Sequence, residues 1–263
     1  MSVLLIVSEM ASLQDGLPEA WKRKNPKRTL AGLVVLGVSS DGSVESMSDA
    51  RRKAKRLQQD LKLSSENIMV LPSLTDLQHG YSGFDEAFFL PLLGREYDHK
   101  KHQFLHLPQI SFVTINSIYC KDHLGFSPGC LEEALLQLSK QSRQPGVVGI
   151  VHYFGLTSFA SSLIEQITNI FPMFCVRDHL RFSISGNAEL DRRAVVQSIG
   201  TKPGTVSFLE YDALKKCARV WTGAFDKGWK ISGHRTYRIL PGRRVVPADL
   251  PAHGTPFFLG DKL

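Results

Sequence analysis

The middle of the chain, residues 109–178, constrains the fold more than any other stretch. Three segments rich in β-branched, aromatic or purely apolar side chains are expected to be strands: residues 110–119, 147–154 and 173–176. Two segments between them carry apolar side chains at the spacing of one helix face: residues 127–138 and 159–171. Two strand–helix–strand crossovers in succession predict a parallel sheet with right-handed connections.

The N-terminal third continues this α/β pattern. Apolar runs predict three more strands, at residues 3–8, 29–38 and 67–71. Residues 50–61 carry a narrow stripe of alanine and leucine, which predicts a helix packed closely on a sheet. Residues 72–108 show little periodicity and are expected to form an irregular loop or lid. The sequence therefore predicts an α/β domain over residues 1–178, with helices flanking a mostly parallel sheet in the first two thirds of the chain.

Residues 179–263 have a different character. A helix is expected after Asn187, with an apolar stripe that reaches Ile199. Short strand-like segments separated by glycine and proline follow, at residues 206–209, 218–222 and 237–240. This pattern predicts a β-rich subdomain or an antiparallel extension of the sheet. The proline-rich tail is expected to pack on the body of the protein or on a partner, which includes self-association.

The composition is typical of a globular protein in a reducing compartment. Hydrophobic residues make up 43% of the chain and charged residues 22%, and no apolar run approaches the length of a membrane span. The apolar residues 1–7 lack a basic leader, which favours a first strand over a signal peptide. Four cysteines at scattered spacings indicate free thiols. We therefore expect an intracellular protein, cytoplasmic or nuclear, that is neither secreted nor integral to a membrane.

The net charge of +7 favours partners that carry phosphate or acidic lipid. A first basic cluster places five cations beside an aromatic ring: Trp21, Lys22, Arg23, Lys24, Lys27 and Arg28. In a nucleic-acid site the cations would neutralise phosphates and the indole would stack on an exposed base. The same run is also typical of a nuclear-import signal or of a solvated loop, and the sequence leaves these alternatives open.

A second basic cluster surrounds the apolar stripe of residues 50–61. The segment from Ser46 to Asp49 has the spacing of a capping box ahead of it. The cations of this cluster are Arg51, Arg52, Lys53, Lys55 and Arg56. A third candidate gathers four arginines around Trp229 and Tyr237: Arg235, Arg238, Arg243 and Arg244. We expect the first two clusters on one face, because they flank a single strand, although a solubilising face would give the same pattern.

Specific catalytic and cofactor fingerprints are absent from the sequence. It contains no Walker loop, dinucleotide-binding glycine motif, nucleophile elbow or His-Glu-x-x-His. We therefore expect no cofactor and a non-catalytic role, in which the protein binds a polyanion. Nucleic acid, either RNA or DNA, is the first candidate partner and an acidic membrane surface the second. A structural or assembly protein, matrix-like or coat-like, is a close alternative, since such proteins also combine basic faces with apolar tails.

Two groups of residues have side chains that zinc favours. One group contains His99, His102 and His106, and the other contains Cys120, His123 and Cys130. Neither group has the doubled, paired spacing of a zinc module, so ordinary loop histidines and a half-buried thiol explain them as well.

An enzyme is the competing class of function, and it would depend on Cys130 and His152. Cys130 falls in the first turn of an expected helix, where the amide donors and the dipole favour the thiolate. His152 ends an expected central strand, and ligands of open α/β sheets bind outside such carboxyl ends. The pair would form a nucleophile and base in a hydrolase or transferase, with Asp178 or Asp122 orienting the imidazole. The alternative is a cysteine that packs a helix and a histidine with one hydrogen bond.

Overall fold

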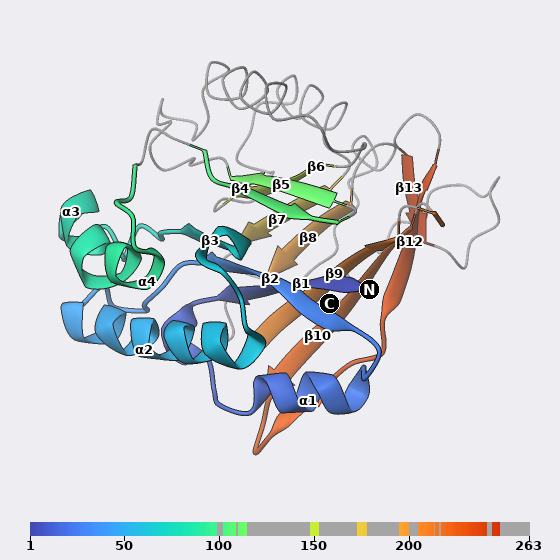
Figure 1. Ribbon diagram of the computed structural model, residues 1–263, viewed down its shortest axis with the longest axis horizontal. Coiled ribbons are helices and arrows are strands. Elements are labelled where there is room, and N and C mark those ends of the chain that lie inside the picture. Colours follow the sequence, from blue (N-terminus) through green and yellow to red (C-terminus); the bar gives the residue numbers. More distant parts are fainter. Residues whose placement is uncertain are drawn as a thin grey trace, which may run out of the picture.

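The computed structural model describes residues 1–98, 102–108, 110–114, 148–152, 173–177, 195–199, 205–212, 214–215, 217–240 and 244–247 of the chain. These residues form two β-sheets and a layer of helices (Figure 1). The helices cover one face of the larger sheet, sheet A, and the smaller sheet, sheet B, lies on its other face. This mixed α/β architecture, in which strands dominate the C-terminal region, confirms the expected fold class in its general form. Within the described ranges, no helix has both the length and the apolar character needed to span a bilayer.

Sheet A joins strands from both ends of the chain in the order β13-β12-β10-β9-β1-β2-β3, with β11 paired to β10. Its strands are β1 (Ser2–Ser8), β2 (Thr29–Leu36), β3 (Ile68–Leu71), β9 (Thr205–Asp212), β10 (Cys217–Phe225), β11 (Trp229–Ile231), β12 (Arg235–Leu240) and β13 (Arg244–Pro247). Strands β1, β2 and β3 are parallel, whereas β9 pairs with β1 in the antiparallel direction. The C-terminal strands therefore extend the N-terminal sheet, which is one of the two arrangements that the sequence indicated.

Sheet B contains the middle of the chain, in the order β4-β5-β6-β7-β8. Its strands are β4 (Phe104–Leu107), β5 (Ile110–Thr114), β6 (Val148–His152), β7 (Met173–Arg177) and β8 (Val195–Ile199). The parallel order expected for this part of the sequence is confirmed for β5, β6 and β7, while the helices expected between them lie outside the described residues. Because each sheet combines strands from before and after residue 178, that position does not separate two packed units.

Among the described residues, the helices of the outer layer come from the first hundred positions. They are α1 (Leu17–Lys24), α2 (Val44–Leu61), α3 (Gly80–Phe84), the π-helical turn η3 (Asp85–Phe89) and α4 (Leu90–Leu93), with 3-10 turns η1 (Met10–Ser12) and η2 (Ser65–Asn67). The N-cap of α2 is Ser43, whose Oγ accepts a hydrogen bond from the amide of Ser46 at 3.1 Å. The helix thus begins before Ser46, and the capping box expected from there to Asp49 is wrong.

The core has two parts because both faces of β1 are covered. Val3, Leu5 and Val7 pack against the helical layer. Leu4 and Ile6, which alternate with them, pack against the side chains of sheet B. Burial on both faces explains why β1 is a continuous apolar run rather than an alternating one.

Residues 72–108 do not form the irregular loop or lid that the sequence predicted. The segments α3, η3 and α4 follow one another without a break, and Phe84, Phe88 and Phe89 are buried in the core. The π-helical turn adds a residue per turn and shifts the apolar pattern, and Pro91 lacks an amide donor in the next turn. Both features hide the helix from a search for a period of 3.6 residues.

The helix expected between Asn187 and Ile199 is also wrong in its last turn. Residues 195–199 form β8, which pairs in parallel with β7. Two valines and an isoleucine in this segment have high β propensity, and a neighbouring strand edge was available to them.

Candidate functional site

Helix α1 carries most of the first basic cluster, and its buried face decides which residues reach solvent. Leu17 and Trp21 lie one turn apart and both face the core. Lys22, Arg23 and Lys24 form the last turn of the helix and are exposed. Cations at this end also interact favourably with the helix dipole. The cluster thus presents three adjacent cations to solvent.

The Trp21 side chain does not reach the surface. It is 2% exposed, its ring stacks on Phe208 with the centroids 4.1 Å apart, and it meets the edge of Trp221 at 5.4 Å. The expectation that this indole stacks on a nucleic-acid base is therefore wrong. The ring fills the space between α1 and the strands β9 and β10, which lie far away in the sequence.

Arg28 is held in a buried charge network rather than offered to a phosphate. Its Nε lies 3.0 Å from Oε2 of Glu210, and its guanidinium lies 5.0 Å from the centroid of the Trp221 ring. The same oxygen of Glu210 accepts from Arg219 at 3.3 Å, and Arg219 also reaches Asp212 at 3.5 Å. Glu210 is 1% exposed, so this network anchors the connection between α1 and β2 to β9 and β10. Arg28, whose side chain is 25% exposed, is therefore committed to Glu210 in this structure, and its place in a binding surface stays a prediction.

Carboxylates neutralise much of the second basic cluster. The apolar stripe of α2 is confirmed, since Met47, Ala50, Ala54 and Leu57 are buried. Arg52 and Lys53 pair with Asp49, and Arg56 pairs with Asp15 at 3.0 Å. Lys53 also donates to the carbonyl of Ala11. Arg51 and Lys55 form no ion pair within the described part of the chain. Both helices lie on the same side of sheet A (Figure 1), and a shared face for the two clusters stays a prediction.

A pocket of about 200 Å³ lies between α1 and the β10–β11 hairpin. Arg23 and Lys24 line it from the helix, and Trp229 and Ile231 line it from β11. The indole nitrogen of Trp229 donates to the carbonyl of Asp15 at 3.0 Å, which fixes the orientation of the ring. The pocket therefore brings an aromatic ring next to two exposed cations. Sequence reasoning missed it because it assigned Trp229 to the arginines of β12.

The third basic candidate lies at the opposite edge of sheet A from β3. Arg235 and Arg238 belong to β12, and Arg244 is the first residue of β13. Arg243 lies outside the described residues. The backbone thus places three of the four arginines on two adjacent antiparallel strands, beyond the hairpin that carries Trp229.

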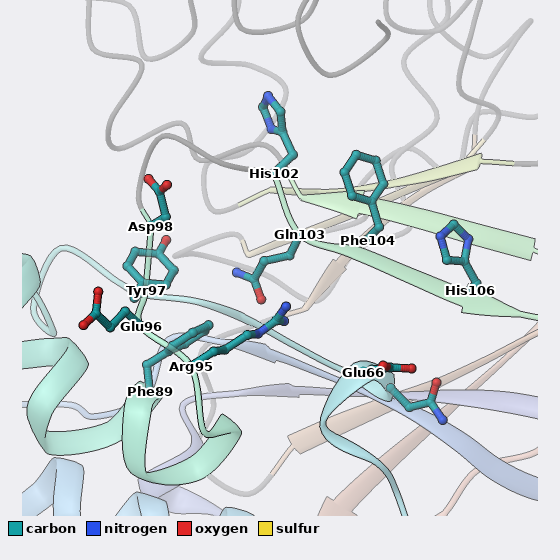
Figure 2. A pocket seen from close by; sticks show the side chains of 11 residues that line it. Glu66, Phe89, Arg95, Glu96, Tyr97, Asp98, His102, Gln103, Phe104 and His106 are labelled. Atoms are coloured by element: carbon teal, nitrogen blue, oxygen red, sulfur yellow. The ribbon is translucent and has the colours of Figure 1, made fainter. Parts of the chain in front are cut away.

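A larger cavity of about 580 Å³ lies where the edge strands of the two sheets approach each other (Figure 2). It is lined by Glu66, Asn67, Phe89, Arg95, Glu96, Tyr97, Asp98, His102, Gln103, Phe104 and His106. The Gln103 side chain points to the side of its segment on which Arg95 lies (Figure 2). Its Oε1 accepts from the amide of Val70 and its Nε2 donates to the carbonyl of Val70. The Gln103 side chain thus covers the free edge of β3. Burial raises the pKa of the Tyr97 phenol, so it stays protonated. The wall of this cavity combines one arginine, two histidines and three carboxylates, so it favours neither an anionic nor a cationic ligand.

The two histidines of this cavity do not share a metal ion. Nδ1 of His102 lies 2.8 Å from the carbonyl oxygen of Thr114, and Nδ1 of His106 lies 2.8 Å from Oγ of Ser111. Four residues of extended chain separate them, a distance of about 13 Å. Across the described ranges no three His, Cys, Asp or Glu residues could hold a metal together. The other proposed ligands, His99, Cys120, His123 and Cys130, lie outside these ranges.

The catalytic alternative depends on where the backbone places His152. His152 ends β6 in the middle of sheet B, as expected, and pairs in register with Val176 of β7. The carboxyl ends of these parallel strands therefore lie next to each other, at the same end of sheet B. Cys130, Asp122 and Asp178 lie outside the described residues, so a nucleophile and base at this edge stays a prediction.

Cys217 is expected to react slowly with thiol reagents. It is 4% exposed, and burial raises the pKa of its thiol, so at a given pH less of it is the reactive thiolate than for an exposed cysteine. At pH 8, the native protein and its Cys217→Ala variant should therefore show the same amount of rapidly labelled thiol. In denaturant, the variant should show one thiol fewer. A rapid phase that disappears in the native variant would contradict this expectation.

Comparisons with known proteins give no family for this chain. No protein-family model matches it, and no curated protein matches it. A crystal structure of a hypothetical protein from Thermus thermophilus is similar to it with a TM-score of 0.44 and 13% sequence identity. That similarity covers 93% of this chain and 99% of the other.

Proposed function

We propose that this protein binds nucleic acid through the exposed cations of α1 and of the connection that follows it. We call Lys22, Arg23, Lys24 and Lys27 the α1 basic face. All four are exposed, and none of them forms an ion pair within the described part of the chain. Phosphate groups would find these charges already free, so binding would not have to break an existing ion pair.

The contrast with α2 is the observation that carries this proposal. On α2, three of the five cations already pair with Asp49 or Asp15. On α1, Glu19 lies one turn before Lys22 and Arg23, yet it forms no ion pair with either of them within the described part of the chain. Within the described residues, the exposed cations of α1 therefore form no ion pairs, whereas three of the five cations of α2 do. The network that holds Arg28 also fixes the end of this face in space.

Two alternatives share the same cations. An acidic membrane surface would be attracted to the α1 basic face by the charge of its headgroups. A matrix-like or coat-like assembly would use the face together with the C-terminal tail, which lies outside the described residues. Nucleic acid is the first choice because a pocket with an aromatic ring adjoins the cations.

Reversing the charge of the α1 basic face is expected to weaken binding to DNA or RNA by about 100-fold or more near 0.1 M salt, because three phosphate contacts are lost. The variant combines Lys22→Glu, Arg23→Glu and Lys24→Glu. For the native protein on duplex DNA, four phosphate contacts predict a slope of about −3.6 in a plot of log K against log salt concentration, and the variant should flatten it. Fluorescence anisotropy over a salt series measures both quantities.

The matched control is the variant Arg52→Glu, Lys55→Glu, Arg56→Glu on α2, which changes the net charge equally. It should retain most of the affinity. Equal losses in the two variants would show that only the overall charge matters and would overturn the α1 basic face. Vesicles rich in phosphatidylserine form a second arm, and preference for them over both nucleic acids would favour the membrane alternative.

A further inference from the structure

We infer that the pocket between α1 and β11 receives an unstacked nucleobase, so that the ligand of the α1 basic face is single-stranded nucleic acid. The inference rests on the proposed function and specifies its ligand. Arg23 and Lys24 belong both to the basic face and to the lining of this pocket. A backbone that follows the cations would therefore carry its bases past the Trp229 indole.

Trp229 differs from the other two tryptophans of the chain in its surroundings. Trp21 and Trp221 are each 2% exposed, whereas Trp229 is only partly buried and contributes to the pocket wall. Its indole nitrogen donates to the carbonyls of Gln14 and Asp15, at 3.3 and 3.0 Å. These hydrogen bonds orient the ring before a ligand binds, so stacking of a base would cost the Trp229 side chain less conformational entropy.

The hairpin that carries Trp229 is also fixed on its far side. The edge of Phe225 meets the indole at 5.6 Å, and the two residues pair across the strands. Lys230 pairs with Asp226 at 2.8 Å across the tight turn. At about 200 Å³ the pocket is smaller than the sites of drug-sized ligands, which suits one planar group.

These features favour single strands over duplexes. An aromatic ring next to cations binds single strands with little dependence on sequence, because every base has a face that can stack. In a duplex the bases are paired and stacked on one another, so only the phosphates would meet the α1 basic face. The α1 cations would therefore contribute to the binding of single strands and of duplexes, whereas the Trp229 indole would contribute only to the binding of single strands.

The variant Trp229→Leu tests the inference with a 12-nucleotide single strand and the matching 12-base-pair duplex as probes. The single strand should bind roughly 5- to 100-fold more weakly, and the duplex should bind within about twofold of the native affinity. Trp229→Phe keeps a stacking ring and should recover much of the loss. Because the other two indoles are buried, the single strand should quench tryptophan fluorescence in the native protein but not in Trp229→Phe. Circular dichroism checks that both variants are folded.

The outcomes separate the inference from the proposed function. If the native protein binds both probes and Trp229→Leu weakens neither, or weakens both equally, the base pocket is overturned and the α1 basic face stands. If the native protein binds neither probe, the proposed function fails and the inference fails with it. A loss confined to the single strand supports both.

Discussion

Replacing Asp76 by alanine is expected to lower the free energy of unfolding by about 4 kcal/mol. The carboxylate is fully buried and accepts from the amides of Val38, Ser39 and Ser73 at 2.7 to 2.8 Å. The Ser39 hydroxyl donates to it as well, at 2.9 Å. Alanine would leave these buried donors without an acceptor, and each such group costs about 1–3 kcal/mol. Urea denaturation measures the loss.

Asp41→Ala provides the matched control, in the connection between β2 and α2 that contains two of the donors to Asp76. Its carboxylate accepts from the amide and hydroxyl of Ser43 at 3.0 Å, but these groups are exposed and water can replace the side chain. A change below about 1 kcal/mol is expected. A similar change in Asp76→Ala would mean that the buried donors find other partners. Asp76 joins the segments that follow β2 and β3, so its loss should loosen the start of α2.

Glu210→Gln is expected to lower the free energy of unfolding by about 3 kcal/mol. The substitution keeps the size of the side chain but removes the charge that Arg28 and Arg219 share. Arg219 is 11% exposed in its side chain, so its charge would remain largely buried beside Asp212 alone. Arg28 is 25% exposed and can turn toward water, which limits the effect.

A double-mutant cycle with Arg28→Met isolates the central pair of this network. The double variant should lose less stability than the sum of the two single changes, because removing both partners leaves no uncompensated charge between them. Asp49→Asn serves as the control, since its partners Arg52 and Lys53 lie on an exposed helix face, and about 0.5 kcal/mol is expected. Equal effects of Glu210→Gln and the control would show that burial does not strengthen the network.

The sequence by itself determined the elements whose signal is local. The apolar runs predicted β1, β2, β3, β5, β6 and β7 to within a few residues, because burial on both faces requires a continuous apolar segment. The stripe of small and apolar residues predicted α2 and its buried face. The basic last turn of α1 was visible as a cluster of charge, and its exposure follows from the packing of the adjacent Trp21 and Leu17.

Only the tertiary structure decided which side chains of that cluster are exposed and which are held. Arg28 finds its carboxylate 182 residues away, at Glu210, and Trp21 finds its cover on β9 and β10. A local pattern shows that an indole or a guanidinium is present, but not whether a distant strand will bury it. For the same reason the sequence named Trp21 as the aromatic ring beside the cations, whereas the fold brings Trp229 there.

The division into two sheets was likewise a tertiary decision. A period of two or a fully apolar run identifies a strand but does not specify its neighbours, so one parallel sheet was expected where the chain builds two. The segment at residues 195–199 shows the same limit, since a short apolar run fits a helix or a strand until the free edge of β7 is available for pairing. Residues 195–199 are a strand because their backbone pairs with β7, and such long-range pairing is not visible in a local sequence pattern.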